Sequence, residues 1–449
     1  MTHFRTDYQQ YLWAPFTQMG DLSDEEPVVM VSGKGAQVTD SRGRTFIDVH
    51  GALWLANAGF GRTEIVEAAY EQMKKLSFFP SFDGMSHQAA VSLARRLVKL
   101  TESLGMGRIF FSCGGSEAVE TALKMAWQYW NLKGKPRKHK IIARRRAYHG
   151  VTMGALAANG LTSNRQLFEP LVPGFRHIPP PYCYRCPYEL SRDSCSLQCA
   201  RELEKTIEFE DPDTVAAFIG EPVMGAGGVI VPPDGYWQEI QRICREYDIL
   251  LIADEVITGF GRTGKLFGCQ HWGVQPDIMV FAKALTSGYL PLGATAAREE
   301  LWEVCLGKQG EGREFRHGNT FAGHAAACAA AAANLDIIER EGLVEQAHSK
   351  GHYLLERLQE LYRMPVVGNV DGLGLLARVE LVSDKDTKLP FAPPGHIGRA
   401  VHQGLLKRGI ILRALGDVLS LSPPLVITQA EIDEVVDNLG EVIQDVNHP

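Results

Sequence analysis

Two ionisable side chains, Asp254 and Lys283, each come directly after an apolar run of the sequence. The runs, residues 250–253 and 277–282, are typical of buried strands. If the strands are adjacent and parallel, both side chains lie at the carboxyl edge of a sheet, where open α/β folds bind ligands. A lysine buried there has a lowered pKa and a nucleophilic amine, as a Schiff-base lysine needs, and a nearby aspartate can keep a pyridine nitrogen protonated. A buried Asp–Lys ion pair explains these two residues equally well.

Two other segments could bind a planar, phosphorylated ligand. Residues 113–116 (Cys-Gly-Gly-Ser) join a predicted strand to a predicted helix, whose first amide groups could bind an anion. Gly115 allows a close approach of the backbone, and Ser116 supplies a hydroxyl and the helix N-cap. Tyr148 and His149 follow another predicted strand, and the tyrosine offers an aromatic face for stacking. The alternatives are an ordinary strand–turn–helix joint and an ordinary loop aromatic.

A glycine motif at residues 259–264 (Gly-Phe-Gly-Arg-Thr-Gly) matches the nucleotide-binding pattern G-x-G-x-x-G, and Lys265 follows it as in a Walker loop. Phosphate-binding versions of these motifs require a helix immediately afterwards. Here an apolar, glycine-broken stretch follows, and Leu266 replaces the Ser or Thr that binds magnesium. We therefore interpret the glycines as a tight turn and reject a nucleotide-binding loop and an NAD-dependent dehydrogenase.

Four cysteines, Cys183, Cys186, Cys195 and Cys199, could supply thiolates to a zinc ion. The segment 179–199 is rich in loop-forming residues, as small zinc sites are, but its eight-residue gap is shorter than common zinc-ribbon spacings. We favour structural thiols in an insertion and predict no metal site, with zinc as the alternative.

The elements that must position these side chains alternate between strands and helices from about residue 88 to residue 300. The pattern predicts an α/β fold in which helices cover both faces of a mainly parallel sheet. We expect a large domain over 61–330 and a smaller one built from 1–60 and 331–449. The predicted strands are 108–112, 140–143, 215–220, 249–253 and 277–281, with short ones within 28–50, and the predicted helices are 117–130, 236–247, 325–342 and 429–446.

Composition narrows the class of protein. The chain has 449 residues, of which 45% are hydrophobic and 22% charged, and this excludes a disordered chain, a collagen-like fibre and a disulfide miniprotein. Lys and Arg number 46 against 53 Asp and Glu, a net charge of −7, which argues against nucleic-acid or membrane partners. We expect the basic runs 133–140 and 144–146 to be solvated surface. Nine cysteines, a polar N-terminal segment (2–11) and the absence of an apolar run long enough to span a membrane predict a cytoplasmic protein.

With these motifs together, the chain resembles the class III, pyridoxal-phosphate-dependent aminotransferases of fold type I, from about Leu12 to Pro424. The most specific stretch is residues 251–264, followed by Pro276-Asp277-Ile278 and Lys283-Ala284-Leu285. The resemblance implies that Lys283 carries pyridoxal 5′-phosphate (PLP) as a Schiff base and that Asp254 pairs with its pyridinium nitrogen.

The remaining roles are also implied by the resemblance alone. His149 belongs to the cofactor site, and the family predicts a homodimer with shared active sites, leaving open whether dimers pair into tetramers. The other assignments are Val256 beneath the ring, Tyr148 above it, Gly115 and Ser116 at the phosphate, Glu221 near the cofactor oxygen and the substrate, and Thr320 at the partner subunit's phosphate.

Three segments, 50–54, 287–294 and 412–417, are similar to the ω-amino acid:pyruvate branch of this family. By that likeness Trp54 lines the substrate pocket and Arg413 binds a carboxylate or sulfonate, although Trp54 could be plain core and Arg413 a surface residue. The expected activity is ping-pong transfer of an amino group from taurine, β-alanine, diamines or other terminal amines to pyruvate, a 2-oxo acid.

Other activities remain open at this point. Residues 12–17 also resemble diaminopelargonate synthases, and residues 322–325 lack the proline usual after their histidine. A racemase, a decarboxylase or an aminomutase of the glutamate-semialdehyde type could use the same lysine and aspartate.

Overall fold

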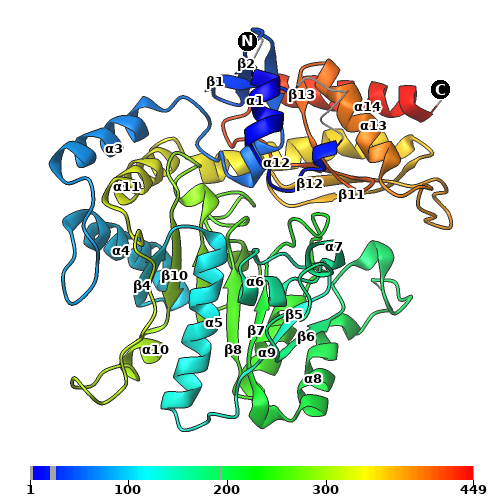
Figure 1. Ribbon diagram of the computed structural model, residues 1–449. Helices are drawn as coiled ribbons and strands as arrows, with labels where there is room; N and C mark the ends of the chain where they lie inside the picture. Colours follow the sequence, from blue (N-terminus) through cyan, green and yellow to red (C-terminus); the bar gives the residue numbers. More distant parts are fainter. Residues whose placement is uncertain (1–3, 21–26, 193, 448–449) are drawn as a thin grey trace.

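A seven-stranded sheet forms the centre of the computed structural model, which describes residues 4–20, 27–192 and 194–447 (Figure 1). Its strands are β4 (Arg108–Ser112), β5 (Lys140–Arg144), β6 (Phe175–Ile178), β7 (Val215–Gly220), β8 (Leu250–Asp254), β9 (Ile278–Phe281) and β10 (Gly293–Ala297). They lie in the order β4-β10-β9-β8-β7-β5-β6. The five strands from β9 to β6 are parallel, and only β10 pairs antiparallel with its neighbours β9 and β4. The prediction of a mainly parallel sheet is confirmed.

Helices cover both faces of this sheet. On one face, α5 (Gly115–Leu132) packs against alternate strand residues such as Ile252, and on the other α9 (Tyr236–Glu246) packs with residues such as Leu251. Both faces of each central strand are therefore buried, which explains their nearly continuous apolar runs. The remaining helices of this part are α4 (Gln88–Thr101), α6 (Met153–Ala158), α7 (Thr162–Arg165), α8 (Gln198–Glu210) and α10 (Glu299–Glu303).

Two four-stranded sheets are built from the chain ends. One consists of β1 (Met30–Lys34), β2 (Gln37–Asp40), β3 (Thr45–Asp48) and β13 (Ile410–Ile411), and the other of β11 (Val367–Gly372), β12 (Ala377–Leu381), β15 (Val418–Leu421) and β14 (Arg413–Leu415). The parallel pairing of β3 with β13 joins the N-terminal and C-terminal parts of the chain. This pairing is consistent with the domain division 1–60, 61–330 and 331–449, which stays a prediction, and residues 1–3, 21–26 and 448–449 lie outside the described residues.

The other helices are α1 (Phe4–Tyr11), α2 (Gly51–Trp54), α3 (Thr63–Lys75), α11 (Ala325–Arg340), α12 (Leu343–Gln359), α13 (His396–Lys407) and α14 (Gln429–Asn447). Some of them lie around the two small sheets, whereas α3 packs on α11 and α11 packs on α4 at the side of the large sheet (Figure 1). Short 3-10 turns are η2 (Glu102–Leu104), η3 (Cys183–Arg185), η4 (Pro212–Thr214), η5 (Gly268–His271), η6 (Lys283–Leu285) and η7 (Glu360–Arg363). Within the described ranges, no helix combines the length and the apolar character needed to cross a bilayer.

The sequence predicts that the basic runs 133–140 and 144–146 are solvated surface, but in the structure two of their residues are buried. Lys138 is buried, and its Nζ donates to the carbonyl oxygens of Asp248 at 2.7 Å and Val215 at 3.2 Å. Arg144 is also buried, with its guanidinium carbon 5.3 Å from the ring centre of Trp237. The prediction is wrong for these two residues because carbonyl oxygens and aromatic faces replace the water that each cation loses.

The glycine motif 259–264 forms a turn, as predicted. Gly261 and Gly264 have left-handed φ values of 95° and 83°, and the Gly264 amide donates to the Gly261 carbonyl at 3.0 Å. A Cβ on Gly264 would lie 2.9 Å from the Cα of His348, so the turn packs tightly on α12. The fully buried Arg262 inside the turn donates to Asn57 Oδ1 at 2.6 Å. The glycine motif therefore connects α12 with the segment around Asn57.

Candidate active site

Three polar residues meet at the carboxyl edge of the large sheet. Asp254 ends β8, Lys283 follows β9 and Glu221 follows β7, and the parallel pairings of these strands bring their ends together. This arrangement is the one predicted for Asp254 and Lys283. Lys283 has a left-handed φ of 48°, which costs a non-glycine residue about 1 kcal/mol or more, so the surrounding structure must hold it in this conformation.

The buried Asp254 carboxylate has two fixed partners. Its Oδ2 lies 2.7 Å from Nδ1 of His149, and its Oδ1 accepts from the Val256 amide at 3.1 Å. A carboxylate only accepts, so Nδ1 of His149 is the donor in this contact. Nε2 is buried and has no partner among the described residues. The Asp254 carboxylate and Nδ1 of His149 are therefore held in place by hydrogen bonds, whereas Nε2 of His149 lacks a hydrogen-bond partner among the described residues.

Glu221 is a second buried carboxylate at the same edge. Its Oε1 accepts from the Tyr148 amide at 3.1 Å and its Oε2 from the Gly225 amide at 2.9 Å. Burial, and then the charge of Asp254, raise the pKa of Glu221, while His149 and Arg144 oppose that rise. The Glu221 side chain therefore fixes the loop that carries Tyr148.

Two residues that sequence reasoning missed support this edge. Arg144 donates to the main-chain carbonyl of Glu221 from below the site. Asn159 accepts from the His149 amide and donates to the Gly150 carbonyl at 2.8 Å. A buried Asn ten residues after His149 carried no signal that could be distinguished from an ordinary loop residue.

The amine of Lys283 is available for chemistry. Burial lowers the pKa of Lys283 to about 8, with the charge of Arg413 lowering it further and those of Asp254 and Glu221 opposing. No described carboxylate lies within ion-pair distance of this amine, so the alternative of a direct Asp254–Lys283 ion pair is not what the structure contains. A lysine amine with a pKa near 8 is a competent nucleophile and base at mildly alkaline pH.

The start of α5 can bind a phosphate group. Its N-cap is Gly114 and no side chain caps it, so its first amide groups are free for an anion. The prediction that Ser116 is the N-cap is wrong, because the helix already begins at Gly115 and Ser116 lies in its first turn. Ser116 Oγ accepts from the Val151 amide at 3.1 Å. Its hydroxyl is thereby oriented beside the helix start.

Gly115→Ala tests whether this glycine is needed for a bound ligand. A Cβ there would lie 3.2 Å from Val256 Cγ1 and 3.6 Å from Ala282 Cβ. We expect a phosphorylated cofactor to bind about tenfold more weakly, because the added Cβ crowds Val256 at the start of the helix. Thermal stability should change little, because alanine favours the helix by about 1 kcal/mol relative to glycine. Equilibrium dialysis measures this affinity. Gly114→Ala is the matched control, since a Cβ at Gly114 meets no atom within 4 Å, and equal weakening in both variants would contradict the prediction.

Two aromatic side chains and one cationic side chain complete the site. Trp54 is only 3% exposed, and its ring centre lies 5.4 Å from Lys283 Nζ and 4.7 Å from the Arg413 guanidinium carbon. Burial raises the pKa of Tyr148, and the charge of Arg413 is close enough to oppose it. The structure therefore brings Trp54, Arg413 and Tyr148 together with Lys283.

The turn that carries Trp54 is strained. Residues 51–54 all have positive φ, although only Gly51 tolerates it readily. Asp48 stabilises the turn, because its carboxylate accepts from the amides of His50 at 3.0 Å, Gly51 at 3.0 Å and Ala52 at 2.7 Å. Strain of this kind, held by a dedicated side chain, is typical of functional sites. No pattern in the sequence indicates this role of Asp48.

Thr320 is the predicted site residue that the structure does not bring into this group. It lies in the exposed loop between α10 and α11, beside the outer strand β4, where Gly323 approaches Phe111. The neighbouring Phe321 is 59% exposed, and Asn319 has a buried side-chain oxygen with no partner in the described part of the chain.

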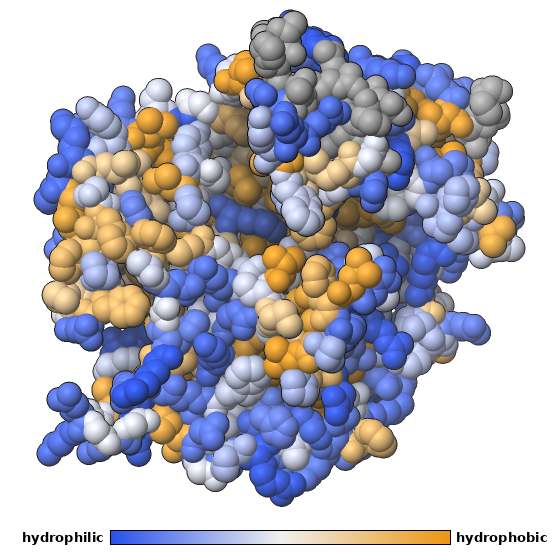
Figure 2. Space-filling model, in the orientation of Figure 1, coloured by the Kyte–Doolittle hydropathy of each residue, from blue (hydrophilic) through white to orange (hydrophobic). Residues whose placement is uncertain are grey.

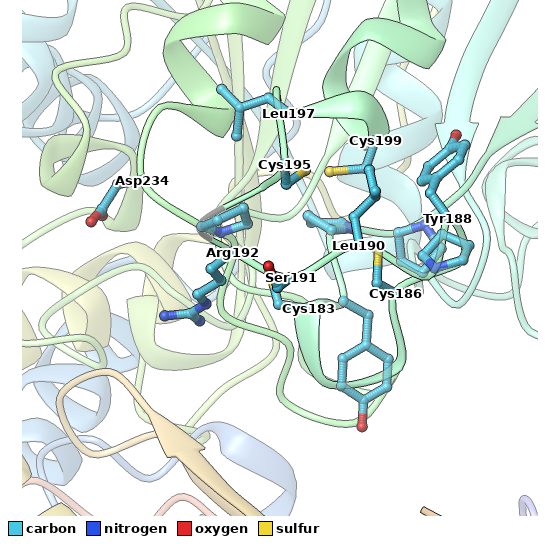
Figure 3. A pocket seen from close by; sticks show the side chains of 15 residues that line it. Cys183, Cys186, Tyr188, Leu190, Ser191, Arg192, Cys195, Leu197, Cys199 and Asp234 are labelled. Atoms are coloured by element: carbon cyan, nitrogen blue, oxygen red, sulfur yellow. The ribbon is translucent and has the colours of Figure 1, made fainter. Parts of the chain in front are cut away.

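The four cysteines of the insertion line one cavity of about 360 Å³ (Figure 3). All are free thiols, and burial raises the pKa of Cys183 and takes that of Cys199 to about 12. Over the described ranges, no three His, Cys, Asp or Glu side chains are arranged to hold a metal ion. Structural thiols therefore remain our prediction for this insertion.

Metal analysis tests that prediction directly. Protein purified without added zinc should contain no stoichiometric metal, and a chelator should leave its thermal midpoint unchanged. The prediction would be contradicted if the protein contained one zinc atom per chain and the Cys195→Ser variant contained none, because the variant lacks one thiolate ligand.

The chain is similar to known aminotransferases over nearly its whole length. Residues 20–443 match the family model described as aminotransferase class-III. The putrescine–pyruvate aminotransferase of Pseudomonas aeruginosa is 41% identical over 94% of this chain and 91% of its own. The adenosylmethionine-8-amino-7-oxononanoate aminotransferase of Geobacter sulfurreducens is 40% identical over 98% and 96% of the two chains. A crystal structure of the ω-transaminase from Pseudomonas jessenii in complex with PMP is 40% identical, covers 98% of each chain and superposes with a TM-score of 0.95.

Proposed function

The chain belongs to the class III aminotransferases, PLP-dependent enzymes that move an amino group from an amine to a keto acid, and from that premise we propose that its donors are terminal amines and its acceptor is pyruvate. The donor class includes taurine, β-alanine and diamines. The observation that carries the proposal is Arg413, a cation beside Lys283 that has no carboxylate within ion-pair distance among the described residues.

The residues at the sheet edge fit PLP. The start of α5, with Gly115 and Ser116, suits its phosphate, and the buried carboxylate of Asp254 suits a protonated ring nitrogen. Lys283 would hold the cofactor covalently through Nζ, and Nε2 of His149 is a buried polar atom still without a partner among the described residues. When bound, PLP supplies an electron sink that allows the amine-bearing carbon of the substrate to lose a proton.

We assign the remaining contacts by their position around this site. Val256, next to Gly115, would pack beneath the ring, and Tyr148 would stack above it. Glu221 would lie beside the cofactor oxygen and the substrate, since it holds the Tyr148 loop. Trp54 would line the substrate pocket.

Each side chain then has a definite task in turnover. Lys283 Nζ, uncharged in part near pH 8, would carry the proton from the amine-bearing carbon of the donor to the cofactor, and in the second half-reaction from the cofactor to the acceptor carbon. Arg413 binds the carboxylate of pyruvate or of an acidic donor, and its planar fork can make two parallel hydrogen bonds. The donor leaves as a carbonyl compound before the acceptor enters, so the kinetics are ping-pong.

Sequence identity does not choose between donor classes, because relatives with different substrates are almost equally similar to this chain. A diaminopelargonate-synthase-like activity is the second candidate, and an aminomutase of the glutamate-semialdehyde type is the third. An unpaired Arg413 next to Lys283 favours small substrates with a carboxylate or sulfonate.

A half-reaction tests the proposal. Taurine, β-alanine, a diamine and 1-phenylethylamine are each added to the PLP-loaded enzyme without an acceptor, and the loss of the visible cofactor band is followed. We expect at least one to react within seconds and pyruvate to restore the band. No reaction with any of them, together with reaction of 7,8-diaminononanoate, would favour the second candidate.

The uptake of PLP by the cofactor-free enzyme should depend on pH through Lys283. Only the neutral amine attacks, so with a pKa of about 8 the rate should rise about tenfold per pH unit below 8 and level off above it. An unperturbed lysine, with a pKa of about 10.4, would give a rate that still rises at about pH 10. Growth of the visible band after mixing measures this profile, and continued steep increase above about pH 9 would contradict it.

We propose further that the chain forms a homodimer with shared active sites. Exposed aromatic residues lie in the Thr320 loop and in the segment after α3: Phe321, Phe79 and Phe82 are 59%, 40% and 44% exposed, and Gly318 lies against Phe82. Figure 2 shows apolar residues gathered over α3, α4 and the segment that follows α3. A surface of this kind suits a second copy, to whose phosphate site Thr320 would contribute. Sedimentation measures the mass, and a monomer would contradict the proposal.

A cytoplasmic location is our proposal for the enzyme, on the basis of its thiols. All nine cysteines are free, which suits a reducing compartment.

A further inference from the structure

The main chain of His50 is held from both sides. Its amide donates to Asp48 Oδ1 at 3.0 Å, and its carbonyl accepts from Ser422 Oγ and from the Trp54 amide, each at 3.0 Å. These bonds do not involve the imidazole. The His50 ring is therefore presented from a fixed backbone at the start of the strained turn 51–54.

The His50 ring is directed at the substrate side of the site. It lies edge-on to Trp54, with ring centres 5.6 Å apart and planes at 90°, and its Nε2 is 3.5 Å from Nη1 of Arg413. Burial, and then the charges of Arg413, His402 and Lys283, lower the pKa of His50 to about 4. The ring is uncharged at neutral pH, and since a guanidinium only donates, Nε2 is the acceptor in this contact.

Arg413 has few other restraints. Its backbone belongs to β14, where it pairs with Ser420, and its guanidinium lies over the face of Trp54 at 4.7 Å. The described residues place no carboxylate within ion-pair distance of it. A free arginine side chain loses rotamer entropy when it binds a ligand, so a partner that orients it beforehand improves binding.

We propose that His50 is a positioning residue that holds Arg413 against Trp54 and thereby sets the affinity for carboxylate-bearing substrates. The inference rests on the proposed function, in which Arg413 binds the substrate carboxylate. Trp54 supplies a face for the guanidinium, and His50 fixes its rotation by accepting from one of its five N–H groups. The other N–H groups remain free for a substrate carboxylate.

The test compares two variants of His50 with two donors. His50→Leu removes the acceptor, and we expect the KM for β-alanine to rise about fivefold while kcat changes by less than about twofold. The half-reaction with 1-phenylethylamine, which has no carboxylate, should change by less than about twofold. His50→Gln retains an acceptor and should keep most of the affinity for β-alanine. Equal losses for both donors, or equal losses in the Leu and Gln variants, would overturn the proposal.

Arg413→Leu separates this proposal from the proposed function. If Arg413→Leu leaves the KM for β-alanine unchanged, the carboxylate role of Arg413 is wrong and the proposed function fails at that point. If it raises that KM and His50→Leu does not, only the role of His50 fails. Where both roles hold, adding His50→Leu to Arg413→Leu should cause no further loss, because the two residues then act as one unit.

Discussion

Lys283→Ala is expected to abolish turnover, with kcat/KM lower by at least about 10⁴-fold. The amine of Lys283 is both the covalent attachment point of the cofactor and the group that moves the proton. Its pKa of about 8 suits both tasks. The fold should tolerate the change, because alanine at a φ of 48° is no more strained than lysine.

The measurement combines activity with the visible spectrum of the protein. PLP should still bind at the start of α5 and at Asp254, but without the band of the covalently bound cofactor, and an added small primary amine should recover a little activity. Lys265→Ala is the matched control, since Lys265 is exposed and its Nζ donates to the Gln270 carbonyl at 3.2 Å, away from the Lys283 site. Full activity in Lys283→Ala would refute the assignment of the active site, and loss of activity in Lys265→Ala would revive the phosphate-loop interpretation of the glycine motif.

The central sheet could be predicted because its strands are buried on both faces. β7 and β8 appear in the sequence as continuous apolar runs, and each is followed or ended by an acid at the ligand edge. β6 (Phe175–Ile178) and β10 (Gly293–Ala297) lie outside the predicted strands. Arg176 and His177 interrupt the apolar pattern of β6, and β10 consists of small residues (Gly-Ala-Thr-Ala-Ala). Arg176 pairs with Glu210 from α8, a partner that local sequence does not reveal.

The site could be predicted in part for the same reason. The comparisons confirm the family and the cofactor that the motifs had suggested, and β8 and β9 bring Asp254 and Lys283 together as expected. The roles of individual residues stay predictions. What the sequence could not show is contact between distant segments: His50 and Arg413 are 363 positions apart, and the left-handed turn 51–54 contains three residues that rarely adopt that conformation.

Asp254→Asn is expected to lower kcat/KM by about 10³-fold while leaving the fold intact. Asparagine has the shape of aspartate, and its single oxygen can still accept from the Val256 amide. Its NH2 group then faces His149 Nδ1, and since both groups donate in the present arrangement, the hydrogen bond between them is lost or reversed. The variant loses the negative charge that holds a proton on the cofactor ring nitrogen, and it changes the hydrogen bonding of His149.

Asp277→Asn is the control that distinguishes a chemical effect from a structural one. Asp277 precedes β9 at the opposite edge of the same sheet, and its carboxylate accepts from the Leu251 amide at 2.7 Å, much as Asp254 accepts from Val256. Its replacement should cost about 1 kcal/mol of unfolding free energy and change the half-reaction rate by less than about twofold. An Asp254→Asn enzyme with a normal half-reaction rate would contradict the electrostatic role of Asp254. Equal losses in the two variants would show that these two carboxylates matter for the fold and not for the chemistry.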